Sequence, residues 1–516
     1  MQRIVSARLG WLRAAEFVTP QVVRLRACAD AVRRDGFTDI VLLGMGGSSL
    51  APDVLRQVCG PSPAAPRFHV LDSIDPDAVR AAMARAGTTL FVLASKSGST
   101  IEPTAAAAEA KRRLVAEGHR NWGTRFVAIT DEDTALHRRA VADGFREIFL
   151  NPADIGGRYS ALSFFGMVPA ALMGLDVDAL LAGARQMDRA CRIERVEENP
   201  GLALGALMAA GAEVGRDKLT ILLPPRLQSL GLWIEQLVAE STGKHGKGIV
   251  PVVGEPPEAA FGQDRLVVAC SVDSEDPPGI DRLAGGDAPH LRLQIPNVAA
   301  LGAEFLRWEI ATATSGWLMG INPFDEPNVQ QAKDATRALL DVYRHERRLR
   351  APEPHASLNG ARLSLSETAL AGLGSEPAPA FLRLLRPNDY FGLLAYLPSD
   401  DPDWEDALHA FRAAVATKTG CATTSGYGPR YLHSTGQLHK GGPNHGVFLI
   451  VTAEPQEDLA VPDEPYSFAV LETAQALGDF QSLSRERRRV ALLRLPRRSV
   501  SLFGEIAGAL VSLIAR

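Results

Sequence analysis

The amino-acid sequence predicts an α/β fold, with two doubly wound domains built on parallel sheets and a C-terminal α/β domain. Three observations support this fold class. Runs of four or five apolar residues end in Gly, Ser or Pro and lead into longer helical patterns, which is typical of buried parallel strands. This pattern fills about residues 35–155 and starts again near residue 217. A stretch with two prolines, Arg350–Asn359, is typical of a linker, and further strand-like runs follow it.

The chain has 516 residues, enough for about three domains at roughly 150 residues each. We place these domains at 1–195, 196–350 and 351–516. Each strand expected in the first two domains is followed by its own loop of small or rigid residues. These strands are Ile40–Leu43, Leu90–Ala94, Phe126–Ile129 and Leu219–Leu223. The C-terminal domain is expected to contain the strands Tyr390–Leu397, Val447–Val451 and Ala491–Leu495, and the helices Trp404–Ala416, Phe468–Leu477 and Leu502–Ala515.

Composition narrows the class of protein. The apolar content of 46% and charged content of 22% are ordinary for a protein with sizeable cores. A net charge of −5 argues against nucleic-acid binding. The longest apolar stretch, Ala161–Leu175, is too short to span a bilayer, and arginines interrupt the N-terminal region where a signal peptide would lie. The five cysteines form no CxxC pair, so neither a disulfide framework nor a zinc site is expected. We expect a cytoplasmic protein.

Two loops with related chemistry follow neighbouring strands. GMGGSSLAPDVL (44–55) places three glycines and two serines before a helix, and SKSGST (95–100) adds hydroxyl donors and one cation. Glycines allow close backbone approach, and a helix start offers free N–H groups to an anion. One such loop by itself is more often a solvated turn in which Ser99 or Thr100 caps the helix. The pair of loops favours a phosphate site.

A candidate general base lies on a predicted helix near residues 230–242. Leu230, Trp233 and Leu237 belong to an apolar stripe, and Gln236 and Glu240 are four residues apart at its margin. A carboxylate buried there would have a raised pKa and could act as a base near neutral pH. The alternative, which periodicity leaves open, is an exposed glutamate at the helix end.

The two phosphate loops resemble those of sugar isomerase domains, which hold the phosphate of a phosphosugar. Three further segments are similar to signatures of the phosphoglucose isomerase family. They are IGGRYSALSFFG (155–166), LGLWIEQLVAESTGKHGKG (230–248) and INPFDEPNVQQAKDATRALL (321–340). The resemblance implies two sugar-isomerase-type domains and an aldose–ketose isomerase that interconverts glucose 6-phosphate and fructose 6-phosphate through a cis-enediol, with no metal or organic cofactor.

The resemblance also implies roles for individual residues. Glu240 would move the proton between C2 and C1, Arg158 would stabilise the enediolate, and Lys333 would assist ring opening near O5. Glu326 stands where the family usually has glutamine. The remaining expected contacts are the phosphate-binding residues Ser48, Ser95, Lys96, Ser97 and Thr100, and the further substrate-site residues Gly47, Glu102 and Gln236.

The family's ring-opening histidine, often supplied by the neighbouring subunit, has no counterpart in the expected segment VVGEPPEAAFGQDRLVV (252–268). The C-terminal domain offers GYGPRYLHSTGQLHKGGPN (426–444), in which His433 or His439 could replace it. Their six-residue spacing and the lack of a carboxylate partner do not predict a metal pair. Alternatively, this segment packs against the isomerase domains or a partner chain.

Two segments, RLGWL (8–12) and PYSFAVLETAQALGDFQSL (465–483), resemble the isomerase half of bifunctional transaldolase–phosphoglucose isomerase fusions. No eightfold strand–helix repeat is seen, so we expect the isomerase part without the transaldolase barrel. The resemblance implies a homodimer, and association with a transaldolase domain. Two functional alternatives stay open: an isomerase that also accepts mannose 6-phosphate, and a phosphosugar-binding regulatory protein that lacks catalysis.

Overall fold

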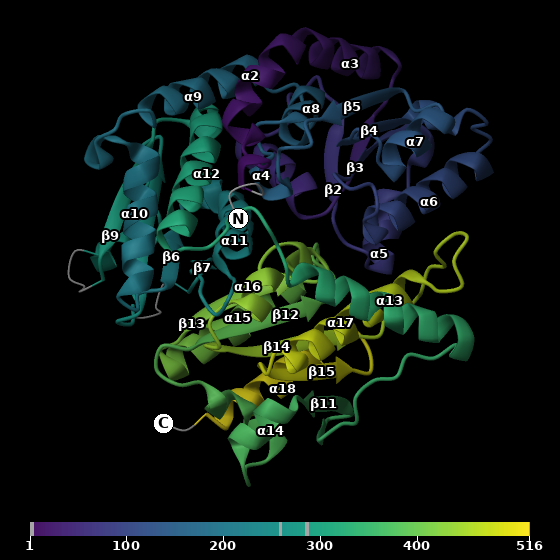
Figure 1. Ribbon diagram of the computed structural model, residues 1–516. Coiled ribbons are helices and arrows are strands. Elements are labelled where there is room, and N and C mark those ends of the chain that lie inside the picture. Colours follow the sequence, from purple (N-terminus) through teal and green to yellow (C-terminus); the bar gives the residue numbers. More distant parts are fainter. Residues whose placement is uncertain (1–4, 257–260, 284–287, 515–516) are drawn as a thin grey trace.

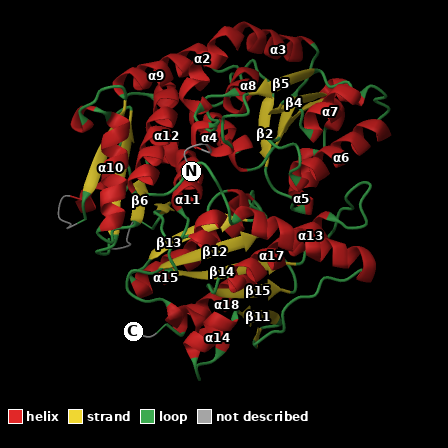
Figure 2. Ribbon diagram, in the orientation of Figure 1, coloured by secondary structure: helices red, strands yellow, loops and turns green. Residues whose placement is uncertain are grey.

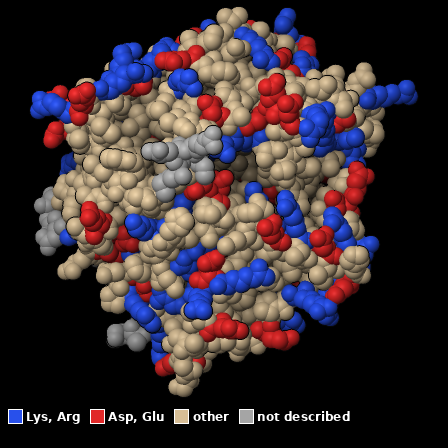
Figure 3. Space-filling view, viewed as in Figure 1, with Lys and Arg blue, Asp and Glu red and all other residues tan. Residues whose placement is uncertain are grey.

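The computed structural model describes residues 5–256, 261–283 and 288–514. Three sheets organise this part of the chain (Figures 1 and 2). The first (purple to blue) and second (teal) lie side by side, and the C-terminal sheet (green to yellow) lies below both in this view. On the face shown in Figure 3, basic and acidic side chains are interspersed. Within the described ranges, no helix combines the length and apolar character that crossing a membrane requires.

The first sheet is fully parallel, in the order β2-β1-β3-β4-β5. Its strands are β1 (Asp39–Leu43), β2 (Arg67–Leu71), β3 (Thr89–Ala94), β4 (Phe126–Asp131) and β5 (Glu147–Asn151). Ile40 and Leu42 face one core, while Val41 and Leu43 face another, so both faces of β1 are buried. The helices α3 (Val22–Arg34), α4 (Leu50–Cys59) and α8 (Phe164–Leu172) cover the first face, and α5 (Pro76–Ala82), α6 (Ile101–Ala116) and α7 (Ala135–Ala142) cover the second.

This strand order places a topological switch point between β1 and β3. Ligands of open α/β sheets bind outside the carboxyl ends of the strands at such a point. The loops 44–49 and 95–100 follow β1 and β3 directly. The fold therefore brings the two polar loops to the position where this sheet offers a ligand crevice.

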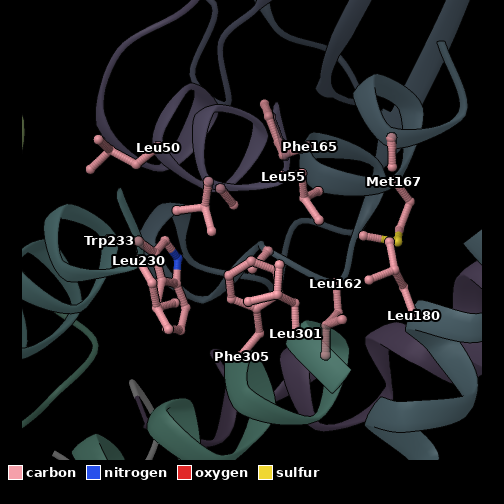
Figure 4. Close-up of a cluster of buried hydrophobic side chains, with 14 of the residues drawn as sticks. Leu50, Leu55, Leu162, Phe165, Met167, Leu180, Leu230, Trp233, Leu301 and Phe305 are labelled. Atoms are coloured by element: carbon pink, nitrogen blue, oxygen red, sulfur yellow. The ribbon is translucent and has the colours of Figure 1, made fainter. Parts of the chain in front are cut away.

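The second sheet is also parallel, in the order β7-β6-β8-β9. Its strands are β6 (Lys218–Leu222), β7 (Val250–Val253), β8 (Arg265–Val272) and β9 (His290–Ile295), and its helices are α9 (Val177–Ala190), α10 (Pro200–Glu213), α11 (Gln228–Thr242) and α12 (Leu301–Leu318). One apolar core joins it to the first sheet, as Figure 4 shows with Leu55 from α4, Phe165 from α8, Trp233 from α11 and Phe305 from α12. The first two sheets therefore share a core, which holds α11 against α4.

The C-terminal sheet has the order β10-β11-β15-β14-β12-β13. The strands β12 (Tyr390–Tyr396), β13 (Ala422–Tyr427), β14 (Gly446–Ala453) and β15 (Arg489–Leu495) are parallel, while β10 (Ala356–Leu358) and β11 (Ala361–Leu365) form an antiparallel edge. The expected linker at 350–359 thus contains β10. The helices α14 (Glu367–Leu373), α15 (Pro402–Thr419) and α18 (Val500–Ser512) cover one face, and α17 (Phe468–Arg485) packs on the other.

The three predicted strands and three predicted helices of the C-terminal domain are present. The last residue of the third predicted helix, Ala515, lies outside the described residues. The same is true of the outermost ends of the predicted domains 1–195 and 351–516. Helix α13 (Val329–Glu346) packs on α17 rather than on the second sheet. The segment 426–444, expected as a loop, contains the end of β13, a short 3₁₀ helix η12 (Arg430–His433) and α16 (Gly436–Gly441). The apolar core that covers α6 continues into the C-terminal sheet.

Candidate active site

The glycines of the first loop lie where four parts of the chain meet. Gly46 has a φ of +53°, and a Cβ atom there would lie 2.6 Å from the His433 carbonyl oxygen and 2.9 Å from Gln236 Nε2. A Cβ atom on Gly47 would lie 2.1 Å from the Gly157 carbonyl oxygen. Only glycine fits such positions. The loop after β1 therefore contacts α11, the 157–159 turn and the C-terminal sheet's η12 at once.

The expected phosphate-binding hydroxyls are grouped at the ends of β1 and β3. Ser48 is buried in the turn before α4, and Ser95 is buried at the end of β3. The Ser95 and Thr100 hydroxyls are 3.1 Å apart, and those of Ser97 and Ser99 are 3.0 Å apart. Thr100 is the N-cap of α6, but its hydroxyl accepts no bond from the helix. The first N–H groups of α6 are thus not capped by this side chain.

Lys96 is directed away from these hydroxyls. Its ammonium group pairs with Asp131 at the end of β4 and donates to the Ala153 carbonyl oxygen at 3.0 Å. Asp131 is largely buried, and the lysine pairs with its Oδ2 atom, while its buried Oδ1 atom has no hydrogen-bond partner in the described part of the chain. The structure does not bring the Lys96 ammonium to the serines.

Arg158 is the centre of a buried charged cluster. It is 4% exposed, and its guanidinium lies 3.0 Å from both the Glu240 carboxylate and the Glu326 carboxylate. It also donates to Ser241 Oγ at 2.8 Å, and to the carbonyl oxygens of Pro323 and Asp325 at 2.7 and 2.9 Å. This planar group is therefore held on several edges, and its position is fixed.

Glu240 lies on the last turn of α11 and is 8% exposed. Burial raises the pKa of its carboxyl, the nearby Glu326 raises it further, and Arg158 opposes the shift. Gln236 Nε2 donates to Glu240 at 3.1 Å and to the His433 carbonyl oxygen at 2.7 Å. The alternative of an exposed glutamate is wrong, because α11 is buried along almost its whole length. A carboxylate in this setting is suited to accept a proton near neutral pH.

Lys244 adds a second cation beside this cluster. Its ammonium group lies 2.8 Å from the Asp325 carboxylate and donates to the Asn322 carbonyl oxygen at 2.5 Å. Burial and the positive charge of Arg158 lower the pKa of Lys244 to about 8. Sequence reasoning missed this residue, although its spacing four residues after Glu240 was a usable signal.

A second cluster forms where the first and C-terminal sheets meet. Glu102, in the first turn of α6, is 3% exposed and lies 2.8 Å from His433 Nε2. Gln475 of α17 donates to the same carboxylate oxygen at 2.6 Å. Burial acts to raise the pKa of Glu102, but the charge and hydrogen bond of His433 outweigh it and lower that pKa. Glu102 therefore stays ionised and holds the histidine.

This second cluster opens into a cavity of about 570 Å³. Its wall includes Ser99 and Thr100 of the second loop, Glu102, His433, and Lys333 of α13. Lys333 is half-buried and has no hydrogen-bond or ion-pair partner in the part of the chain that the structure describes. The hydroxyl-lined loop, the histidine and a free cation thus border one cavity. Glu240 and Arg158 are not part of its wall; Gln236 links the Glu240 carboxylate to the His433 backbone carbonyl instead.

Comparison with known proteins identifies the family of this chain. The model of the phosphoglucose isomerase family matches residues 30–251. A glucose-6-phosphate isomerase from Thermosynechococcus vestitus is 32% identical over 355 residues, which cover 60% of this chain and 67% of that protein. The chain belongs to the phosphoglucose isomerase family. A glucose-6-phosphate isomerase from Prochlorococcus marinus is 31% identical over 350 residues, which are 59% of this chain and 63% of the relative. The chain thus spans about two thirds of the length of these relatives.

Solved structures extend the likeness to the fold. A hypothetical protein from Thermus thermophilus aligns with a TM-score of 0.59 at 27% identity, covering 65% of this chain and 92% of that one. A glucose-6-phosphate isomerase from Chlamydia trachomatis aligns with a TM-score of 0.54 at 22% identity, covering 63% of this chain and 74% of that one. The prediction of sugar-isomerase-type domains is therefore confirmed at the level of the fold.

The structure separates the two histidines proposed to stand in for the family's ring-opening residue. His433 borders the cavity, whereas His439 of α16 is 3% exposed and its ring lies 4.9 Å from that of Phe448 and 6.4 Å from that of Tyr390. Burial lowers the pKa of His439 well below its usual value. His439 is thus a core residue of the C-terminal sheet and is not brought to the site.

Besides Lys244, three further contributors to the site were missed. Ser241 and Tyr159 lie within the phosphoglucose isomerase segments, and their hydroxyls are 3.2 Å apart beside Arg158. Gln475 is a buried amide on a helix of the C-terminal sheet, and no local pattern distinguishes it from a core residue. Within the described ranges, no group of three or more His, Cys, Asp or Glu side chains is arranged to hold a metal ion.

Proposed function

We propose that this chain interconverts glucose 6-phosphate and fructose 6-phosphate by proton transfer between C2 and C1 through a cis-enediol. The observation that carries the proposal is the buried Glu240 carboxylate, which has a raised pKa and lies 3.0 Å from the Arg158 guanidinium. A base of raised pKa next to a fixed cation is what proton abstraction beside a carbonyl requires, because the developing oxyanion needs a charge partner. Membership in the phosphoglucose isomerase family supports the same reaction.

In this proposal the sugar phosphate lies across the ends of β1 and β3. The hydroxyls of Ser48, Ser95, Ser97 and Thr100 hold the phosphate, since hydroxyl groups donate hydrogen bonds to its oxygens. Lys96 contributes through the position of the loop rather than by direct contact, because Asp131 occupies its ammonium group.

At the reacting carbons, Glu240 accepts the C2 proton of the open-chain aldose and returns it to C1. Arg158 faces the oxygens on C1 and C2 and offsets their developing negative charge. Gln236 orients the Glu240 carboxylate, and Glu326 takes part by holding Arg158. His433 and Lys333, both on the wall of the 570 Å³ cavity, open the sugar ring. The mechanism uses no cofactor.

We further propose that the enzyme works in the cytoplasm as a homodimer and associates with a transaldolase domain, as the family resemblance implies. The same pocket could also accept mannose 6-phosphate if its size allows the C2 epimer of the substrate to bind. Size-exclusion chromatography with light scattering tests the dimer, and assay with mannose 6-phosphate tests the substrate range.

The decisive experiment couples glucose 6-phosphate formation from fructose 6-phosphate to NADP reduction by a dehydrogenase. The proposal expects steady turnover by the wild-type chain and none by Glu240→Gln, with 6-phosphogluconate binding retained by both. A wild-type chain that binds 6-phosphogluconate but never turns over would instead identify a phosphosugar-binding regulatory protein.

A further inference from the structure

The Glu102 carboxylate is held by two residues of the C-terminal sheet. His433 and Gln475 are 331 and 373 residues away in the sequence, yet both reach the same oxygen of Glu102. One comes from η12 and the other from α17, two elements that pack on the same face of this sheet. The C-terminal sheet therefore contributes to the site at two separate points.

We propose that the C-terminal unit, residues 351–516, completes the ring-opening end of the site within its own chain. His433 is the proton-transfer group, and Gln475 is a positioning residue that acts on it through Glu102. This inference rests on the isomerase function proposed above. It assigns a catalytic purpose to the C-terminal unit and makes each chain's site independent of a second copy.

The hydrogen bonds of His433 determine which of its ring nitrogens can exchange a proton with the substrate. An ionised carboxylate can only accept, so His433 Nε2 carries the hydrogen that faces Glu102. The Nδ1 atom has no hydrogen-bond partner in the described part of the chain, and the side chain borders the cavity. Gln475 donates to the same carboxylate and fixes its orientation. Nδ1 is therefore the atom that exchanges protons with the sugar.

The proposed step conserves atoms and electrons. Protonated His433 gives the Nδ1 proton to the ring oxygen O5 while the C1–O5 bond breaks and C1 becomes a carbonyl. The C1 hydroxyl loses its proton to solvent water, and solvent reprotonates the imidazole. Nothing is oxidised or reduced, and closure of the ring on either face of the carbonyl gives either anomer.

The backbone that carries His433 is clamped to the first two sheets of the same chain. Arg430 donates two hydrogen bonds of 2.7 Å to Asp72, at the end of β2. The His433 carbonyl oxygen accepts from Gln236 at 2.7 Å and lies against Gly46. Elsewhere in the C-terminal unit, Arg498 pairs with Asp75 before α5. A fixed backbone is what a proton-transfer group needs, because small displacements are costly in rate.

Enzyme-dependent exchange between the two anomers of glucose 6-phosphate, measured by NMR, isolates ring opening. The Glu240→Gln chain serves as the parent, since it should open the ring without isomerising the sugar. Adding His433→Ala is expected to slow exchange by roughly 100-fold. Adding His409→Ala, an exposed histidine of α15, should leave the rate unchanged. Undiminished exchange in the His433→Ala chain would overturn the assignment.

Gln475→Ala in the same parent should slow exchange about tenfold and move the acidic limb of its pH profile upward. The amide donor lowers the pKa of Glu102, so its removal lets that carboxyl protonate sooner. The other ionisable groups near Glu102 are His433 of η12, Lys333 of α13 and Tyr396 of β12, and all three remain in this variant. An unmoved profile would mean that Gln475 is only a packing residue.

A mixing experiment tests completeness within one chain. Chains carrying Glu240→Gln and chains carrying His433→Ala are co-expressed with different tags, and any species bearing both tags is purified. We expect isomerase activity no higher than the sum of the two single variants, whether or not mixed species form. Recovery to a quarter or more of wild-type activity would show that His433 serves a neighbouring chain. If the wild type itself does not isomerise, the proposed function fails instead.

Discussion

The two ends of the candidate site are built in different ways. The cluster around Arg158 and Glu240 is formed within the first two sheets, which share one apolar core. The cluster around Glu102 forms only where the C-terminal sheet meets the first, through His433 and Gln475. The proton-transfer end is thus fixed by local packing, whereas the ring-opening end depends on how one unit docks on another.

This difference predicts which amino-acid substitutions should affect proton transfer without affecting ring opening, and the reverse. A substitution in the first cluster should stop proton transfer and leave ring opening intact. A substitution at the docking contacts should impair ring opening first. Substitutions at either end test this separation, and their expected effects range from a near-complete loss of turnover to a small change in KM.

Glu240→Gln should lower kcat by roughly 10³-fold or more, which leaves no turnover detectable in these assays, because general-base catalysis typically contributes 10² to 10⁴. The isosteric amide keeps contact with Gln236, and Arg158 retains Glu326 as a charge partner. The coupled assay measures the loss, and thermal unfolding checks that the fold persists. A fall of less than tenfold in a folded variant would assign the proton transfer to another group.

Arg158→Lys should lower kcat by about 10²-fold, since a lysine cannot reproduce the forked contacts of a buried guanidinium. It should also destabilise the fold, because Glu240, Ser241 and two carbonyl oxygens lose donors. Steady-state kinetics and urea unfolding measure the two effects. As a matched control, Arg189→Lys on the exposed face of α9, outside the cavity wall, should change neither by more than twofold.

Asp72→Asn should weaken docking of the C-terminal unit, because it leaves the Arg430 guanidinium without its carboxylate. We expect the free energy of unfolding to fall by about 2–3 kcal/mol. Removing one partner of a fully buried ion pair costs roughly 3–5 kcal/mol, and the loss here should be smaller because Arg430 is partly exposed. Anomer exchange should fall with it. Asp406→Asn, on the exposed side of α15, is the control. Full exchange in a destabilised Asp72→Asn chain would break the link between docking and ring opening.

The pH dependence of kcat should have its acidic limb above the ordinary glutamate value of 4.5. Burial raises the pKa of Glu240, so as pH falls the base is protonated earlier and the rate declines earlier. Gln236→Ala should move this limb further up, since the Gln236 hydrogen bond lowers that pKa. Rate measurements between about pH 3.5 and 9 test both shifts, and an acidic limb at 4.5 would contradict the burial argument.

Lys96→Met should have the smallest effect, with the KM for fructose 6-phosphate changed by only about threefold, because Asp131 already occupies the ammonium group. If KM instead rises by two orders of magnitude while kcat stays unchanged, Lys96 binds the phosphate directly.

Sequence reasoning predicted the fold from local signals. Short apolar runs that lead into Gly, Ser, Thr or Pro marked β1, β3, β4 and β6, and the position of the polar loops followed from parallel-sheet geometry. It missed β2 and β5, where exposed or half-buried polar residues such as Arg67 and Glu147 interrupt the apolar pattern. Helix periodicity placed Glu240 at the margin of the apolar stripe but left its burial open, because it cannot tell whether the end of a helix is covered; the packing of α11 decides it.

The C-terminal contribution could not be derived in the same way. His433 and His439 are six residues apart in one polar segment, and only docking of the C-terminal sheet decides which one reaches Glu102. In the sequence, Gln475 is indistinguishable from a core residue of α17. Its role is visible only in the folded chain, where α17 lies beside α6 and Gln475 donates to Glu102. Contacts between residues so distant in the sequence depend on how whole units pack, and no local pattern encodes that packing.

The most direct test of proton transfer by Glu240 follows the isomerisation of fructose 6-phosphate in D₂O by NMR. If the Glu240 carboxylate carries the proton between carbons, part of it exchanges with solvent, so the glucose 6-phosphate formed by the wild-type chain should contain deuterium at C2. The Glu240→Gln chain should form neither labelled nor unlabelled product. Glucose 6-phosphate formed without any deuterium, or formed equally fast by the variant, would contradict proton transfer by Glu240.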